Sequence, residues 1–291
     1  MRAVFQFGVA SFFVAAVACS SVSAAGIGES KSYHGPTGLQ LYSLRDMFKS
    51  QGVTPTLDLV QKWGFKYVEV AGTYGLTPAE FKAELDKRSL VPIGSHFPYE
   101  RLRDDLDGVI REAKALGLIY VGCAWISHQA PFDETQCRAA AAVFNRAGKA
   151  LAEQGMKFYY HNHGYEFYPH GSGTLFDLLV AETDPQTVYF QMDVLWTVFP
   201  GQDPAKLLEK YPNRWLLLHL KDLKKGVPTG SLAGHTELTN DVALGSGQVD
   251  WPALMRAAQK VGVKYYFIED ESPTVVDQIP QSLRVLEQLE F

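Results

Sequence analysis

The stretch REAKALGLIYVGC, residues 111–123, joins the end of an amphipathic helix to a glycine and then to a short apolar run. The same order of helix, glycine and apolar run returns at residues 59–70, 149–160 and 256–268. Glycine favours the left-handed conformation that ends a helix. Near-continuous runs of Val, Ile, Tyr and Phe are typical of parallel strands that are buried on both faces. The repeated unit therefore predicts helices that alternate with parallel strands.

The chain contains enough of these apolar runs to close a barrel. We expect strands at residues 38–43, 65–70, 90–96, 118–123, 156–160, 188–193, 215–220 and 263–268. Eight alternating β and α units predict an α/β fold, a single (β/α)₈ TIM barrel. The alternative is an open, doubly wound sheet, which would need a glycine-rich turn after its first strand, and residues 42–46 contain no glycine. The long irregular stretch at residues 224–249 is a candidate lid.

The first residues have the pattern of a secretory signal peptide. Met1-Arg2 gives a positive start, residues 3–18 are apolar and uncharged, and Val22-Ser23-Ala24 supplies small residues for cleavage. We predict a signal peptide at residues 1–25, a barrel domain at residues 26–291, and a secreted or periplasmic location. The alternatives are a lipoprotein-type cleavage before Cys19 and a retained anchor, although the apolar run is short for a membrane span.

The composition limits the partners of the chain. Hydrophobic residues make up 46% of it, which supports a large core, and the net charge of −5 argues against a nucleic-acid partner. Two cysteines, Cys123 and Cys137, remain after removal of the signal peptide. An exported protein could pair them, but two cysteines are no disulfide framework.

Polar residues gather where the predicted strands end, and this is where barrels of this kind place their catalytic groups. Taken singly, His219 could be a core histidine, Asp193 a turn cap and Glu269 an exposed loop carboxylate. Burying acidic groups together is costly unless a cation compensates for their charge. Carboxylates with imidazoles therefore predict one divalent metal ion, which could be Mn, Mg, Co or Zn. The strand-end residues are Gln40, Glu69, His96, His161, His163, Glu166, Asp193, His219 and Glu269.

Six motifs together resemble one known family. They are GLQLYS at residues 38–43, YHNHGYEF at 160–167, QMD at 191–193, LHLKD at 218–222, LGSGQVDW at 244–251, and Ile268-Glu269. The combination is similar to the sugar phosphate isomerase/epimerase superfamily, the xylose isomerase-like TIM barrels, from Gly38 to the C-terminus.

This resemblance implies a metal held by a carboxylate at strand five, an Asp at strand six, a His at strand seven and a Glu at strand eight. Asp193, His219 and Glu269 match the last three positions. At strand five the position that usually holds Glu is occupied by His161. This difference weakens the assignment of the chain as a standard ketose 3-epimerase. We favour Glu166, five residues later, as the fourth ligand, with His161 as the alternative.

The resemblance also implies proton abstraction next to a sugar carbonyl through an enediolate. We expect Glu269 to act as the base, with His161 or His163 as alternatives. Lys221 would neutralise the oxyanion or, alternatively, pair with Asp222. We expect the groups that contact the substrate to be Gln40, Glu69, His96 and Trp196, with a role as second acid/base groups as the alternative for Glu69 and His96. Trp125, Trp196 and Phe199 either stack on a sugar or pack in the core.

The expected substrate is a small-molecule sugar or keto-sugar, and the enediolate could lead to epimerisation, isomerisation or loss of a β-substituent. The chain is thus predicted to be a metal-dependent isomerase or epimerase, or a keto-sugar lyase or hydratase. A metal-dependent phosphodiesterase of the apurinic endonuclease type is one alternative, although it would want more histidines and a basic face. A non-catalytic sugar-binding barrel is the other.

Overall fold

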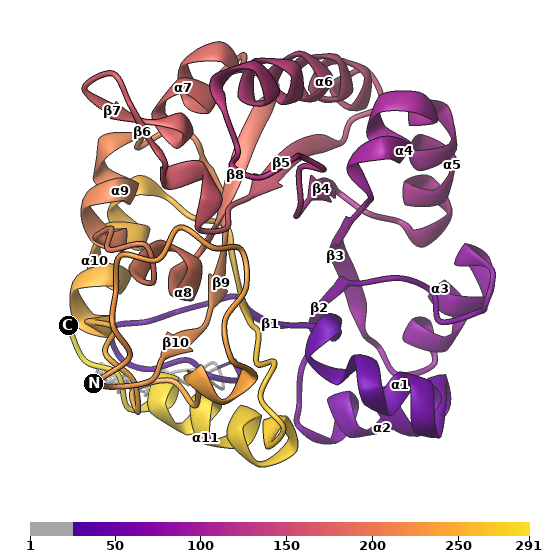
Figure 1. The fold of residues 1–291 in the computed structure, drawn as a ribbon. Coiled ribbons are helices and arrows are strands. Elements are labelled where there is room, and N and C mark those ends of the chain that lie inside the picture. Colours follow the sequence, from indigo (N-terminus) through magenta and orange to yellow (C-terminus); the bar gives the residue numbers. More distant parts are fainter. Residues whose placement is uncertain (1–25) are drawn as a thin grey trace, which may run out of the picture.

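The computed structural model describes residues 26–291, and their strands form a closed barrel of eight parallel strands in the order β1-β12-β9-β8-β5-β4-β3-β2. The predicted signal peptide and Cys19 lie outside the described residues. Looking along the barrel, Figure 1 shows the helices as a ring outside the strands. The strands are β1 (Thr37–Gln40), β2 (Tyr67–Val70), β3 (Val91–His96), β4 (Tyr120–Cys123), β5 (Lys157–His161), β8 (Val188–Asp193), β9 (Trp215–Leu220) and β12 (Tyr265–Ile268). The predicted (β/α)₈ TIM barrel is confirmed.

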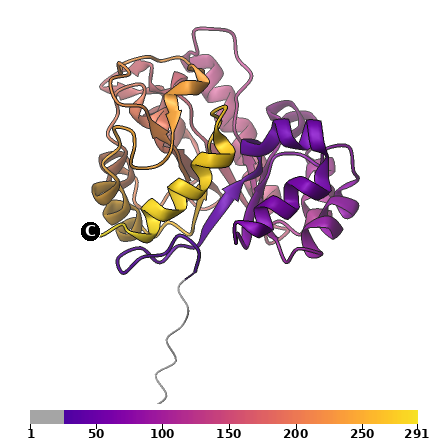
Figure 2. The same cartoon turned by 90° about the horizontal axis from the view of Figure 1, so that it is seen from below.

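Helices connect successive strands, as the repeated unit predicts. Gly117 (φ 71°) and Gly262 (φ 78°) end α5 and α10 in the left-handed conformation, which glycine adopts without steric cost. Helix α11 lies beside the first βα unit in Figure 2, so the last unit closes against the first. The helices are α1 (Arg45–Gln51), α2 (Val53–Lys62), α3 (Pro78–Asp86), α4 (Tyr99–Asp104), α5 (Leu106–Leu116), α6 (Glu134–Ala152), α7 (Leu175–Glu182), α8 (Val194–Val198), α9 (Pro204–Lys210), α10 (Trp251–Val261) and α11 (Val275–Glu287).

The connections between the barrel strands and helices contain further short elements. They are the 3₁₀ turns η1 (Leu41–Leu44), η2 (Tyr165–Phe167) and η3 (Leu238–Asn240), the pair β6 (Pro169–His170) and β7 (Gly173–Thr174), and the pair β10 (Asp222–Leu223) and β11 (Asp241–Val242). Of the helices in the described part of the chain, none is both long enough and apolar enough to cross a membrane.

The first strand is shorter than the predicted 38–43. The side chain of Gln40 accepts a hydrogen bond from the backbone N–H of Tyr42 at 3.0 Å, and this bond caps the turn η1. The chain therefore leaves the barrel wall after Gln40, and Tyr42 lies at the mouth of the barrel instead of within a strand.

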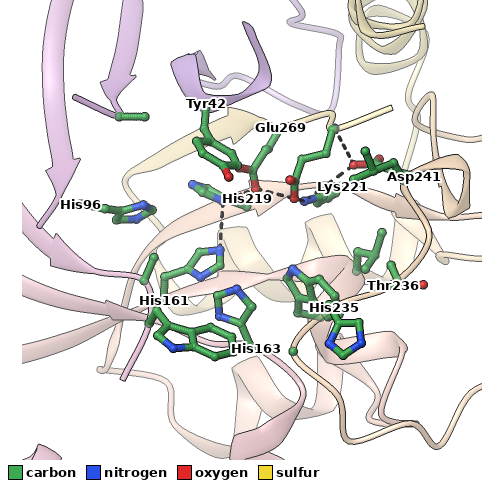
Figure 3. A pocket seen from close by; sticks show the side chains of 18 of the residues that line it. Tyr42, His96, His161, His163, His219, Lys221, His235, Thr236, Asp241 and Glu269 are labelled. Carbon is green, nitrogen blue, oxygen red and sulfur yellow. Dashed lines mark hydrogen bonds and ion pairs between the residues drawn. The ribbon is translucent and has the colours of Figure 1, made fainter. Parts of the chain in front are cut away.

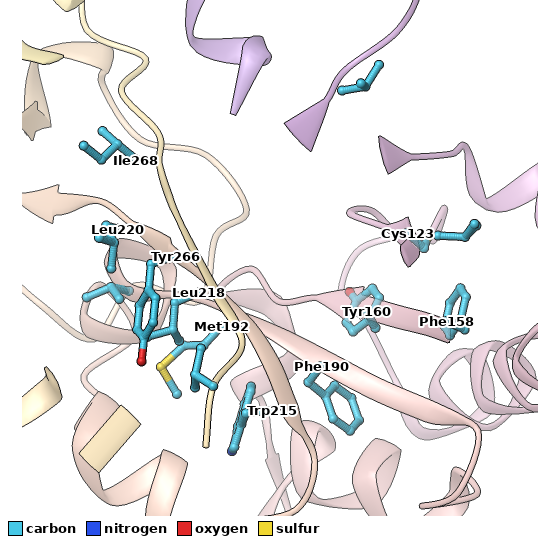
Figure 4. Close-up of a cluster of buried hydrophobic side chains, with 14 of the residues drawn as sticks. Cys123, Phe158, Tyr160, Phe190, Met192, Trp215, Leu218, Leu220, Tyr266 and Ile268 are labelled. Carbon is cyan, nitrogen blue, oxygen red and sulfur yellow. The ribbon is translucent and has the colours of Figure 1, made fainter. Parts of the chain in front are cut away.

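Two apolar clusters support the barrel wall and its interior, and a third, small one of Leu195, Trp196, Phe199 and Leu223 lies beyond the ends of β8 and β9. The larger one fills the space between the outer faces of the strands and the helices, and Figure 4 shows part of it. The smaller one combines Ile93, Tyr120, Tyr159, Leu216, Leu217 and Phe267. Since strand side chains alternate between faces, Tyr159 shares its face with His161, and Leu217 shares its face with His219. The barrel interior is thus apolar below and polar towards the strand ends.

Cys123 and Cys137 are both free and buried. Their thiols face the backbone carbonyls of Trp125 and Leu175, respectively. The structure therefore contains no disulfide between residues 26 and 291, and the cysteines act as packing residues.

Candidate metal and substrate site

A pocket of about 450 Å³ opens at the C-terminal ends of the barrel strands. Its floor carries five side chains from the ends of β3, β5, β9 and β12 or from the residue just beyond: His96, His161, His219, Lys221 and Glu269. Figure 3 shows these side chains converging from opposite sides of the barrel. This is the size and lining of a site for a small molecule.

Four side chains of the described residues place one ligand atom each within 4.8 Å of one another: His161, Asp193, His219 and Glu269. His161 Nε2 lies 3.1 Å from His219 Nδ1 and 3.3 Å from Asp193 Oδ2. His219 Nδ1 lies 3.0 Å from Glu269 Oε2 and 3.9 Å from Asp193 Oδ2. We call these four residues the His₂-Asp-Glu cluster.

The spacing of the cluster fits one divalent cation. Donor atoms about 2.1 Å from a common ion are separated by about 3.0 Å at right angles and by about 3.4 Å at tetrahedral angles. The separations within the cluster fall near these values. In addition, Asp193 Oδ2 is buried and finds no hydrogen-bond donor among residues 26–291. A buried carboxylate oxygen without a donor is costly, and a cation at this point would remove that cost.

The electrostatics of the cluster point in the same direction. Burial lowers the pKa of His219, but Glu69 and Glu269 outweigh it and raise this pKa to about 10. Burial raises the pKa of Asp193, and the nearby Glu269 adds to that effect. Lys221 and His219 together hold the pKa of Glu269 well below its usual range in spite of burial. The carboxylates thus require positive charge, which a proton on His219 or a metal ion in its place can supply.

The structure brings His161, not Glu166, to the other three residues, so the preference for Glu166 is corrected. Glu166 lies in the turn η2, fully buried, where it accepts hydrogen bonds from the hydroxyl of Tyr160 and from the backbone N–H of His163 at 2.9 Å. Its carboxylate is therefore engaged in hydrogen bonds that stabilise the turn. The alternative ligand of the sequence analysis, His161, takes the fourth position.

Gln40 and Glu69 were predicted to bind substrate, but both are fully buried and neither lines the pocket. Glu69 Oε2 accepts hydrogen bonds from Gln40 Nε2 at 2.6 Å and from His219 Nε2 at 2.5 Å. These two residues lie beneath the pocket floor, in a buried hydrogen-bond network with His219. The geometry therefore does not support direct substrate contact by either residue.

Lys221 lines the pocket and is almost fully buried. Its ammonium lies 2.5 Å from Glu271 Oε1, 3.4 Å from Glu269 Oε2 and 3.7 Å from Asp241 Oδ2. Burial would lower the pKa of Lys221, but these acidic neighbours raise it well above its usual value. Lys221 is therefore a fixed positive charge beside the cluster, and the alternative pairing with Asp222 does not occur.

The walls of the pocket contain further predicted residues. His96, His163 and Trp196 all line it, as does Trp125, whereas Phe199 packs behind the ring of Trp196. Burial lowers the pKa of His96, and it lowers the pKa of His163 well below the usual value. Both imidazoles are therefore neutral near neutral pH.

Sequence reasoning missed the part of the rim that comes from the candidate lid. Residues 234–238, between β10 and β11, and Asp241, the first residue of β11, border the pocket. The irregular, Gly- and Ser-rich composition of residues 224–249 indicated a loop over the functional face but not which of its side chains turn inward. Tyr159 and Gln191, which hydrogen-bond Glu69, were also missed. The available signal was that each of them stands two residues before a strand-end residue, Tyr159 before His161 and Gln191 before Asp193.

The sequence profile of the family described as "Xylose isomerase-like TIM barrel" matches residues 57–289. The chain is similar to an inosose dehydratase of Clostridium tetani, with 37% identity over 100 residues, which span 33% of this chain and 32% of that protein. An inosose dehydratase of Clostridium botulinum (strain Alaska E43 / Type E3) shares 25% identity over 213 residues, 65% of this chain and 70% of that protein.

Among solved structures, a sugar phosphate isomerase/epimerase from Parabacteroides distasonis ATCC 8503 is similar with a TM-score of 0.72 and 25% identity. The match covers 92% of this chain and 96% of that one. The profile match covers most of the chain, including every strand-end residue of the pocket beyond β1. The chain therefore belongs to the xylose isomerase-like TIM barrel family.

Proposed function

We propose that this protein is a divalent-metal-dependent enzyme that removes a proton next to the carbonyl of a keto-sugar or a related cyclic ketone. The observation that carries the proposal is the convergence of the His₂-Asp-Glu cluster on one point at the pocket floor, with Asp193 Oδ2 left without a hydrogen-bond donor. The names of the relatives, inosose dehydratase and sugar phosphate isomerase/epimerase, support the same class of substrate.

His161, Asp193, His219 and Glu269 would hold the ion. A bound divalent cation polarises a carbonyl and stabilises the negative charge that develops on its oxygen as the neighbouring C–H is deprotonated. Lys221, a fixed ammonium on the pocket floor, adds to this stabilisation from the protein side.

The structure changes the expectation that Glu269 is the catalytic base. Glu269 and His161 both belong to the cluster that would hold the ion, so their donor atoms would be engaged there. His96 and His163 flank the cluster as neutral imidazoles on the pocket wall. We therefore assign proton abstraction to one of these two residues.

Elimination is the outcome that the relatives favour. Loss of H⁺ from the carbon next to the carbonyl, followed by loss of OH⁻ from the β-carbon, forms a C=C bond and releases one molecule of water. Reprotonation without loss of hydroxide would give epimerisation or isomerisation instead. The phosphodiesterase alternative is not favoured, because the other His/Glu grouping among the described residues shares His219 and is no independent site.

The test is deuterium exchange. The purified protein is incubated with Mn²⁺ in D₂O and with a panel of ketoses, inososes and 3-keto-glycosides, and deuterium at the α-carbon is measured. We expect Glu269→Gln to abolish exchange. Either His96→Asn or His163→Asn is expected to lower exchange at least about 100-fold while metal content stays unchanged. The exposed His34 serves as control, with His34→Asn unaltered. Undiminished exchange in Glu269→Gln would refute the proposal.

The export of the chain stays a prediction. It fits a free sugar as substrate, since sugar phosphates are largely found inside cells. Measurement of the N-terminus of the secreted or periplasmic protein, expected near Ala25 or Gly26, tests it.

A further inference from the structure

We propose that Glu69 is a positioning residue that fixes the protonation pattern of two imidazoles of the site, His219 and His96. The proposal rests on the proposed function, since it concerns how that site is kept ready. Glu69 lies on β2 and is fully buried. Its carboxylate meets donors from four other strands: Gln40 on β1, Tyr159 on β5, Gln191 on β8 and His219 on β9.

The donor and acceptor roles in this network can be assigned from one group that can only donate. The backbone N–H of Tyr42 can only donate, and it donates to Gln40 Oε1 at 3.0 Å. The amide nitrogen of Gln40 must therefore face Glu69, and it donates to Glu69 Oε2 at 2.6 Å. Glu69 Oε2 thus acts as an acceptor, as expected of a carboxylate with several donors around it.

The consequence for His219 is direct. Its Nε2 lies 2.5 Å from the same Glu69 Oε2, so Nε2 must carry a proton and donate it. The opposite nitrogen, Nδ1, faces the His₂-Asp-Glu cluster, 3.0 Å from Glu269 Oε2. A carboxylate behind a ligating histidine orients the ring and raises its basicity. Glu69 therefore presents Nδ1 of His219 to the ion.

The consequence for His96 passes through Gln191. The amide nitrogen of Gln191 donates to Glu69 Oε1 at 2.9 Å, which turns its oxygen towards His96 Nε2 at 2.8 Å. Nε2 of His96 must then be the donor. In the neutral ring, Nδ1 of His96 keeps its lone pair, and the ring borders the pocket. The same carboxylate thus prepares one imidazole to bind the ion and another to accept a proton.

An amide cannot replace this carboxylate. In Glu69→Gln, the NH₂ group must face either the pair Gln40 and His219 or the pair Tyr159 and Gln191. In the first case two donors oppose each other at His219. In the second case Gln191 must turn over, and its NH₂ then meets the N–H of His96. At least one of the two imidazoles must change its proton or its partner.

The experiment uses the zinc-loaded protein with ¹⁵N-labelled histidine. Ring N–H signals, assigned with His96→Asn and His219→Asn, report which nitrogen is protonated, and competition with a chelator gives the Zn²⁺ affinity. We expect the proton on Nε2 of both rings in the unmodified protein. In Glu69→Gln at least one of these signals moves or disappears, and the affinity falls by about tenfold or more. Glu166→Gln is the matched control, because it replaces another fully buried carboxyl group by an amide and is expected to leave both readouts unchanged.

Two results would overturn the proposal: a proton on Nδ1 of either ring in the zinc-loaded unmodified protein, or unchanged signals and affinity in Glu69→Gln. If Glu69→Gln does not fold, Gln191→Met removes the link to His96 alone, and an unaltered His96 signal would then be the contrary result. A protein that binds no Zn²⁺ contradicts the proposed function only, since the Nε2–H signals of His219 and His96 in the metal-free protein, compared with those of Glu69→Gln, still decide the role of Glu69.

Discussion

Glu166 shows at the scale of one residue how burial sets chemistry. Its carboxyl group is fully buried among Tyr160, Tyr165 and the backbone of His163. Burial raises its pKa from 4.5 to about 7, although the hydrogen bonds from Tyr160 and His163 counteract part of this rise. The folded protein therefore keeps a proton on Glu166 at pH values where the unfolded chain has released it.

This difference predicts a pH-dependent stability. As pH rises from about 4.5 to 7, only the unfolded state loses the proton of Glu166, so the free energy of unfolding decreases across this window. The shift corresponds to about 3 kcal/mol at most. Glu166→Gln lacks this loss, so its stability relative to the unmodified protein should increase between pH 4 and pH 8. Urea denaturation of both proteins at the two pH values measures the effect, and a difference that does not depend on pH would contradict it.

The same residue marks the limit of sequence reasoning about the site. Asp193, His219 and Glu269 could be predicted to meet because strand ends of a parallel barrel share one rim. The choice between His161 and Glu166 could not, because it depends on the turn η2, which directs Glu166 back to the N–H of His163. The position of Glu69 below the pocket could not be predicted either. Whether a strand residue contacts substrate or supports another side chain depends on which layer of the barrel interior it occupies, and the sequence does not show this.

At the scale of elements, Asp222 organises the segment between β9 and α10. Its carboxylate accepts hydrogen bonds from the N–H groups of Gly245 at 2.9 Å and Gly247 at 3.0 Å, and from the indole of Trp251 at 3.0 Å. Its other oxygen accepts from the N–H of Val249 at 3.2 Å. One side chain thus ties β10 to the return of the loop that borders the pocket.

We expect Asp222→Asn to loosen this segment, because its NH₂ group would face donors that now meet an acceptor. The cost is about 1–3 kcal/mol. Hydrogen exchange should accelerate at residues 241–251, and limited proteolysis should favour residues 224–249. Asp250→Asn is the control, since Asp250 caps α10 with one hydrogen bond to the N–H of Ala253 and Asn caps as well as Asp. Equal protection in Asp222→Asn and the unmodified protein would show that other contacts hold the loop.

Element boundaries were predictable to different degrees. All eight strands were found, because apolar runs bounded by helix-ending glycines mark them clearly. The end of β1 was placed three residues too late, since the bond from Tyr42 to Gln40 that begins η1 leaves no trace in hydrophobicity. Asp222 was considered only as a partner of Lys221, because its backbone donors come from residues more than twenty positions away.

At the scale of the whole molecule, the cluster joins β5, β8, β9 and the end of β12. An ion that binds only the folded state stabilises the entire barrel. At 1,000 times the dissociation constant the gain is about 4 kcal/mol, which for a domain of this size raises the melting temperature by on the order of 10 °C. Thermal unfolding with Zn²⁺ or Mn²⁺, reversed by a chelator, measures this rise. Asp193→Asn should lose it, and an equal rise in that variant would place the ion elsewhere.

The pocket mouth is the other feature that spans the molecule. Tyr42 follows the first strand, Trp125 the fourth and Leu238 belongs to the late loop, and these side chains are 43%, 44% and 47% exposed. Three apolar side chains from distant parts of the chain are therefore exposed to water around a charged pocket floor. A ligand with a flat apolar face would remove all three from water when it binds, so the pocket would favour molecules that carry such a face above their reacting carbonyl.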